Sequence, residues 1–231
     1  MPLPKLEVPK YTLTLPSSGD VIEYRPFLVK EEKNLMIAQE TGEGNTVFDA
    51  IKAIVKACTY DKLDTENMPT YDLEYVFLKI RTKAVGETAD IQLECEETGL
   101  KVPVSVNLED VYIQKPEGFE NEKVVQITKD IGMTLQPIRV GQLGDIENST
   151  DLTTTIKSLI KNIYDADNVY PIEDSDADEL DSFIESLPHK VLQEVNDFLI
   201  GQPKLALDVE FTGPKGHKNK QTITGFQNFF G

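Results

Sequence analysis

Residues 91–106 have the sequence IQLECEETGLKVPVSV, and residues 205–224 have the sequence LALDVEFTGPKGHKNKQTIT. In both stretches apolar residues alternate with polar ones on either side of a corner that contains glycine, a pattern that predicts a β-hairpin. The two corners, residues 95–99 and 212–216, share a layout in which glycine occupies the fifth position. We expect these two hairpins to pack together although they lie far apart in the sequence.

The layout of the two corners resembles that of zinc knuckles. Two knuckles with Cys at the first and fourth positions would supply the four thiolates of a zinc ribbon. Here these positions are Cys95, Thr98, Thr212 and Lys215, so only one is a Cys and one carries an ammonium group. His217 could add a nitrogen, but one thiolate and one imidazole are too few ligands. We therefore predict degenerate knuckles without metal, with a zinc site as the alternative.

Helical segments are predicted where apolar residues recur every three or four positions. They are residues 29–39, 46–58, 70–83, 176–187 and 189–200. A further helix is expected to begin at Asp151, because Ile156, Leu159, Ile160 and Ile163 follow at helical spacing.

The sequence thus predicts an α+β fold, in which helices are combined with several β-hairpins and two of the hairpins resemble metal-free zinc-ribbon knuckles. We expect a single elongated unit over residues 1–231. Its parts are an arm and hairpin (1–28), a helical part (29–85), a mainly β part (86–141), a second helical part (142–201) and a C-terminal hairpin (202–231).

Composition indicates a folded protein that binds other proteins. The 231 residues include 23 Lys and Arg against 40 Asp and Glu, which gives a formal net charge of −17. Nucleic-acid phosphates and anionic membranes would repel such a chain. Apolar runs of membrane-spanning length and a signal-peptide pattern are absent from the sequence, and the two cysteines, Cys58 and Cys95, imply no disulfide framework. We expect protein partners, no bound nucleic acid or membrane, and a reducing, cytosolic place of synthesis.

The negative charge is concentrated in the middle of the chain. Residues 86–201 hold 8 basic and 25 acidic residues, whereas the segments on either side are close to neutral. An acidic surface that serves only solubility is one interpretation. The other is a docking face for a basic neighbour in an assembly, which the sequence alone leaves open.

One acidic segment has the spacing of a calcium-binding EF-hand loop. Its first, third, fifth and twelfth positions are Asp174, Asp176, Asp178 and Glu185. The sixth position, which requires glycine, is Glu179, so the loop could not make its usual turn. We interpret the segment as the acidic start of a helix, where carboxylates cap backbone amides.

Catalytic patterns do not emerge from the sequence. The two histidines, His189 and His217, lie outside any HExxH motif, and GxSxG, Walker and GxGxxG patterns do not occur. Cys58 is most simply a small apolar residue near the end of a helix. We therefore expect neither enzyme activity nor a cofactor.

The C-terminal segment holds three closely spaced aromatic residues, Phe226, Phe229 and Phe230. Exposed aromatics suit the buried centre of a protein interface, so these residues form a candidate interface. The alternative is that they fold back onto the helices as part of the core.

Four segments resemble the T4-type bacteriophage baseplate hub and hub-assembly protein family. They are residues 11–19 (YTLTLPSSG), 24–33 (YRPFLVKEEK), 73–81 (LEYVFLKIR) and 225–230 (GFQNFF). Members of this family often carry CxxC knuckles at the two hairpin corners. This chain retains only Cys95 there, which places an inherited metal in doubt.

The resemblance implies a non-enzymatic protein of a contractile phage tail. As a structural component of the central hub region of the baseplate, it would bind other baseplate and tail proteins, such as hub, spike, tube or wedge subunits. It would be assembled in the host cytoplasm and remain in the virion. The alternative is a chaperone that assists assembly of the hub and then leaves.

Overall fold

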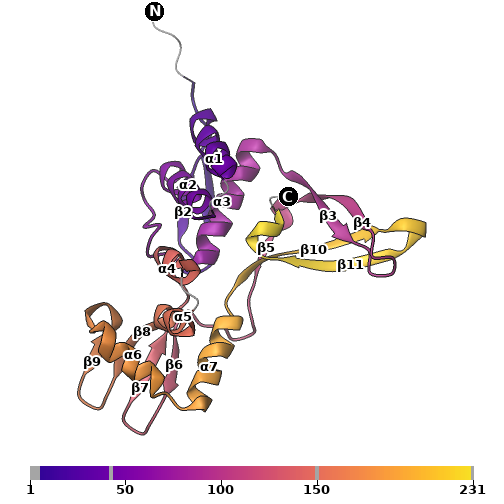
Figure 1. Ribbon diagram of the computed structural model, residues 1–231. Helices are drawn as coiled ribbons and strands as arrows, with labels where there is room; N and C mark the ends of the chain where they lie inside the picture. Colours follow the sequence, from indigo (N-terminus) through magenta and orange to yellow (C-terminus); the bar gives the residue numbers. More distant parts are fainter. Residues whose placement is uncertain (1–5, 42–43, 149–150, 230–231) are drawn as a thin grey trace, which may run out of the picture. The chain divides into compact units, whose positions relative to one another are not determined.

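The computed structural model describes residues 6–41, 44–148 and 151–229 (Figure 1). In these ranges helices are combined with small antiparallel sheets, which confirms the predicted α+β class. The chain divides into two compact units. Unit 1 comprises Met1–Thr65, Tyr71–Gln114 and Lys204–Gly231, and unit 2 comprises Glu66–Thr70 and Lys115–Pro203. The single elongated shape expected from the sequence stays a prediction.

Unit 1 contains three helices and three small sheets within the described residues. Its helices are α1 (Val29–Thr41), α2 (Gly44–Cys58) and α3 (Thr70–Val85). Its strands are β1 (Tyr11–Thr14), β2 (Val21–Tyr24), β3 (Thr88–Glu94), β4 (Lys101–Asn107), β5 (Tyr112–Gln114), β10 (Lys204–Thr212) and β11 (Lys218–Thr224). The sheets are β1-β2, β3-β4 and β11-β10-β5.

The N-terminal part of unit 1 is joined by a mostly buried ion pair. Arg25, just after β2, places Nη2 3.0 Å from Oε1 of Glu31 in α1. The other carboxylate oxygen of Glu31 accepts a hydrogen bond from the Leu28 amide at the start of the helix, at 2.8 Å. The backbone amide of Arg25 also donates to the Cys58 carbonyl at the end of α2, at 3.0 Å. One residue pair therefore connects β2, α1 and α2.

Burial near this ion pair changes the pKa of the Cys58 thiol, whose side chain is inaccessible to solvent. Desolvation raises the pKa of Cys58 to about 11, and the nearby Arg25 only partly opposes this shift. The thiol is thus protonated at neutral pH and acts as a small apolar residue.

The two predicted hairpins, β3–β4 and β10–β11, pack together in unit 1 as expected. Ile91 and Val106 of the first hairpin share one buried cluster with Leu207, Val209 and Ile223 of the second. Hairpins of this kind are marginal alone, and the shared cluster supplies the apolar burial that each lacks. The structure therefore joins segments separated by more than a third of the chain.

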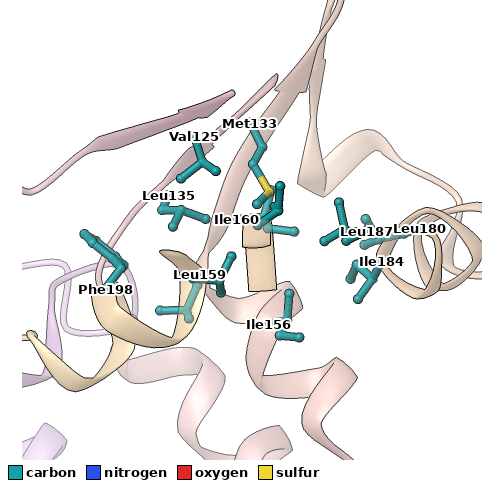
Figure 2. Close-up of a cluster of buried hydrophobic side chains, with 12 residues drawn as sticks. Val125, Met133, Leu135, Ile156, Leu159, Ile160, Leu180, Ile184, Leu187 and Phe198 are labelled. Carbon is teal, nitrogen blue, oxygen red and sulfur yellow. The ribbon is translucent and has the colours of Figure 1, made fainter. Parts of the chain in front are cut away.

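Unit 2 is built around a four-stranded antiparallel sheet with the order β6-β7-β8-β9. Its strands are β6 (Lys123–Gln126), β7 (Gly132–Leu135), β8 (Ile160–Tyr164) and β9 (Val169–Pro171). Its helices are α4 (Leu143–Asn148), α5 (Leu152–Leu159), α6 (Ala177–Glu185) and α7 (His189–Ile200). Figure 2 shows apolar side chains from the sheet and from α5, α6 and α7 gathered into one buried cluster.

The helix predicted to begin at Asp151 is shorter than expected. Helix α5 ends at Leu159, and Ile160 begins strand β8, so the predicted helical part 142–201 contains two strands. The cause is pairing with β7, in which Met133 lies opposite Ile163 and Leu135 opposite Ile160. A β-branched residue such as Ile suits a strand once a partner strand is present. The helical spacing was therefore misleading at this point.

The described helices are short: α3, the longest of them, has 16 residues. Several of its side chains are charged, among them Lys79, Arg81 and Lys83. Within the described ranges, no helix combines the length and the apolar character needed to cross a membrane.

Replacing Glu31 with Gln is expected to destabilise unit 1, because the Arg25 guanidinium would stay buried without its carboxylate partner. The free energy of unfolding should fall by about 3 kcal/mol near neutral pH, measured by urea denaturation followed by circular dichroism. Glu32→Gln removes an exposed carboxylate from the same turn of α1 and serves as the control. It should cost less than about 0.5 kcal/mol.

The effect of Glu31→Gln should also depend on pH. Burial alone would raise the pKa of Glu31, but hydrogen bonds from Arg25 and Leu28 outweigh it, so the pKa lies below its ordinary value of 4.5. The contribution of the pair is then fully present above that value and is lost as the pH falls through the lower pKa of the folded protein. A stability difference that stayed constant down to about pH 3 would contradict this account.

Leu159→Ala should destabilise unit 2 by about 2–5 kcal/mol, because it opens a cavity at a fully buried position of the cluster in Figure 2. The control is Leu152→Ala at the start of the same helix, since Leu152 is 64% exposed. Thermal unfolding followed by circular dichroism would compare the two variants. Equal losses of stability would show that α5 does not anchor the core.

Candidate functional site

The structure brings the two hairpin corners together, but not through the four knuckle positions. Cys95 is fully buried and lies against Gly213, where an added Cβ atom would approach the Cys95 Sγ atom to 2.6 Å. Thr98 is half-buried, whereas Thr212 and Lys215 are exposed. The second corner therefore meets Cys95 through a glycine, whose missing side chain leaves room for the sulfur atom.

Asn219 of β11 connects the corners through hydrogen bonds. Its side chain is buried, and its Oδ1 atom accepts from the Glu96 amide at 3.1 Å. Its Nδ2 atom donates to the Cys95 sulfur at 3.6 Å and to the His217 carbonyl at 3.1 Å. One amide side chain thus satisfies three polar groups at a place where two zinc knuckles would share a metal ion.

The Cys95 sulfur is surrounded by hydrogen-bond donors. A hydrogen bond from the Thr98 side chain has the largest influence and lowers the pKa of Cys95. Burial acts in the opposite direction, while the amides of Glu97 and Thr98 and the side chain of Asn219 reinforce the lowering. The sulfur atom is therefore held by protein donors from both hairpins.

Two further contacts join the hairpins outside this buried network. The Nδ1 atom of His217 pairs with the Glu97 carboxylate, and the Gln221 side chain donates to the Glu94 carbonyl at 2.7 Å. These contacts link the end of β3 and the corner that follows it to β11 and to the loop that precedes β11. His217 therefore takes part in the contact between the two hairpins.

The residues at the corners do not form a metal-ligand set. In the part of the chain that the structure describes, no group of three or more His, Cys, Asp or Glu side chains could hold a metal ion. The resemblance of the corners to zinc-ribbon knuckles is not confirmed. That the purified protein is free of metal stays a prediction.

The C-terminal aromatics lie partly in the core of unit 1. Phe229 is fully buried in the cluster shared by the hairpins, so its ring serves the core rather than an exposed interface. Phe226 packs at the edge of this cluster and contacts the Phe77 ring edge-on, with centroids 5.8 Å apart. Phe230 lies outside the described residues. An interface at this end of the chain stays a prediction for Phe226 and Phe230.

The segment with EF-hand spacing is the start of a helix, as interpreted from the sequence. Asp176 is the N-cap of α6, and its Oδ1 atom accepts from the amides of Asp178 and Glu179 at 3.0 and 3.2 Å. An N-cap carboxylate stabilises the helix start through these hydrogen bonds and the helix dipole. The acidic residues of this segment therefore have a local structural role.

Comparison with known proteins gives one result. The model of the family described as T4 bacteriophage base plate protein matches residues 8–231, nearly the whole chain. The chain belongs to this family. No curated protein and no solved structure matches it. Membership in this family implies that the chain is a component of the baseplate of the phage virion. It also implies that the chain interacts with other baseplate proteins.

The acidic excess of this base plate protein is concentrated in unit 2. Unit 2 contains 7 basic and 19 acidic residues, whereas unit 1 contains 16 basic and 21 acidic residues. The acidic middle seen in the sequence thus corresponds largely to one folded unit. An electrostatic attraction for a basic partner would act mainly on that unit.

Two residues that connect the corners, Asn219 and Gly213, were not predicted from the sequence. A signal for Asn219 was present, because residues 219, 221 and 223 share one face of β11 and Ile223 marks that face as buried. Gly213 carried no such signal, since a glycine in a corner has many possible roles. Both are recognised only when the other hairpin is in place.

Asn219→Ala should destabilise unit 1 by about 1–3 kcal/mol, because the Glu96 amide and the His217 carbonyl would lose a buried partner. Asn228→Ala is the matched control, since Asn228 is exposed and its Nδ2 atom donates to the Thr224 carbonyl at 2.8 Å. Chemical denaturation would measure both variants. The connecting role of Asn219 fails if its variant is no less stable than the control.

Proposed function

We propose that this base plate protein is a non-enzymatic structural component of the central hub region of the baseplate. It binds neighbouring baseplate and tail proteins during assembly and stays in the virion. The observation that carries the proposal is the family match over residues 8–231. A match of this extent means that the family pattern covers both units rather than a single shared module.

The surroundings of the histidines support a non-enzymatic role. His217 pairs with Glu97 between the hairpins, and His189 is the first residue of α7 after the N-cap Pro188. Cys58 is buried with a raised pKa, which disfavours the reactive thiolate form. His217 and Cys58 thus serve pairing and packing in the fold, whereas His189 lies exposed at the start of a helix.

The charge of unit 2 supports binding to other proteins in an assembly. A unit with 19 acidic and 7 basic residues attracts a basic neighbour over a distance of about 10 Å at moderate salt. Such attraction steers association and favours one orientation of the partners. We expect basic surfaces of adjacent baseplate proteins to face unit 2.

Quantitative mass spectrometry of purified virions tests the structural role. Isotope-labelled reference peptides would give the number of copies per particle relative to an established virion protein. We expect a whole-number ratio in virions, because a structural subunit occupies defined positions in a symmetric assembly. A phage-encoded cytoplasmic enzyme, measured in the same samples, controls for carry-over from the lysate.

A chain that is abundant in infected lysate but no more frequent in virions than this control would contradict the proposal. That result would favour a chaperone that leaves after assembly. Chemical cross-linking of intact particles would test the hub position, with cross-links expected to central rather than peripheral baseplate proteins.

A further inference from the structure

A groove in unit 2 lies between the β8–β9 hairpin and the start of α6, and we call it the β9–α6 groove. Its volume is about 550 Å³, within the range of roughly 300–1,000 Å³ that binding clefts usually have. Figure 1 shows these elements beside one another in unit 2. The groove thus offers room for side chains of another molecule.

Apolar side chains line much of the groove. They include Ile131, Ile163, Val169, Leu180 and Phe183. Leu180 is buried and belongs to the core, whereas Val169 on the terminal strand β9 is 64% exposed. Apolar surface that is exposed inside a concavity is a usual feature of a binding site.

Carboxylates also line the groove, and no lysine, arginine or histidine is among its lining residues. The acidic lining residues are Asp165, Asp174, Asp176 and Glu179. In the described ranges none of these four forms an ion pair, although neighbouring carboxylates do. Glu173 pairs with Arg139 at 3.1 Å, and Asp181 pairs with Lys157 at 2.6 Å. Among the described residues, no ion pair thus neutralises the negative charge of these four carboxylates.

Tyr170 lines the groove next to the Asp165 carboxylate. It is 45% exposed, and its hydroxyl group donates to Oδ2 of Asp165 at 2.8 Å. The amides of Asp167 and Asn168 also donate to Asp165, and together with Tyr170 they lower its pKa, so the carboxylate stays charged. A guanidinium or ammonium group could lie on the ring while it faces the carboxylate.

A metal ion is a poor occupant for this groove. The Oδ1 atoms of Asp165 and Asp176 already accept backbone amides, and the described residues contain no set of three metal ligands. Apolar walls favour a long aliphatic stem or an apolar side chain instead. Lys and Arg combine such a stem with a positive head group.

We infer that the β9–α6 groove binds a segment of a neighbouring baseplate protein in which Lys or Arg side chains flank an apolar anchor residue. The anchor packs against Val169 and Phe183, and the basic side chains face Asp174 and Glu179. This inference rests on the proposed function for the existence of such a neighbour. Charge complementarity and the apolar lining specify the chemistry of the segment.

The test uses the full-length chain and overlapping peptides of about 15 residues from the baseplate and tail proteins of the same phage. Fluorescence polarisation would identify peptides that bind. We expect the best binders to carry two or more basic residues beside an apolar or aromatic residue. Their affinity should fall at least about tenfold between roughly 50 and 500 mM salt.

Variants then locate the binding site. Asp174→Asn combined with Glu179→Gln should weaken the best peptide about tenfold at low salt. Glu117→Gln combined with Glu120→Gln removes the same charge from exposed positions of unit 2 outside the groove and should change affinity less than about twofold. Tyr170→Ser should weaken binding, whereas Tyr170→Phe, which keeps the ring, should retain most of it.

Hydrogen exchange gives a measurement that needs no variant. Bound peptide should protect amides of β9 and of the first turn of α6. Equal weakening by the two charge-matched double variants, selection of acidic peptides, or the absence of any binder tighter than about 100 μM would each overturn the inference. Specific binding by a chain that is absent from virions would refute the structural role but leave the groove assignment intact.

Discussion

The short antiparallel pairing of β5 with β10 is the constraint on which the division of the chain depends. Gln114, the last residue of β5, lies opposite Lys204, the first residue of β10. These are also the residues at which the chain leaves unit 1 and returns to it. Because adjacent strands hold the two ends, the intervening segment can form most of unit 2 as an insertion, which folded domains tolerate when the ends are close. The remaining part of unit 2 is the short segment Glu66–Thr70. The same pairing places β10 and β11 where they can pack on the earlier hairpin.

The packing of the two hairpins is stabilised by apolar burial, while polar contacts determine how the two corners meet. A structural zinc site contributes roughly 10–16 kcal/mol to the folding of a small domain, whereas each buried hydrogen bond contributes about 1 kcal/mol net. The bonds of Asn219 could not replace such a site in energy. The cluster that includes Leu207, Ile223 and Phe229 supplies the larger stabilisation, and Asn219 restricts how the corners meet.

The sequence predicted those helices and strands whose conformation is determined by residues close to them in the chain. The alternation around the two corners predicted both hairpins, and Asp176 predicted the start of α6 because an N-cap acts within its own turn. The helical spacing of apolar residues gave a wrong prediction at Ile160, because pairing with strand β7 determines the conformation there. Likewise, the spacing of Phe229 could not distinguish an interface residue from a core residue. The β9–α6 groove was also invisible in the sequence, because its walls come from elements that meet only after folding.

The separation of the two hairpins along the chain also determines the order in which the nascent protein can fold. At about 5–20 residues per second, a ribosome needs roughly 6–23 s to progress from the end of β4 to the end of β11. During this interval the β3–β4 hairpin lacks the strands that cover Ile91 and Val106. All residues of unit 2 are synthesised before the last part of unit 1. A stalled or shortened nascent chain would therefore carry a folded second unit together with an uncovered apolar hairpin surface, which makes it a target for aggregation and for cellular quality control.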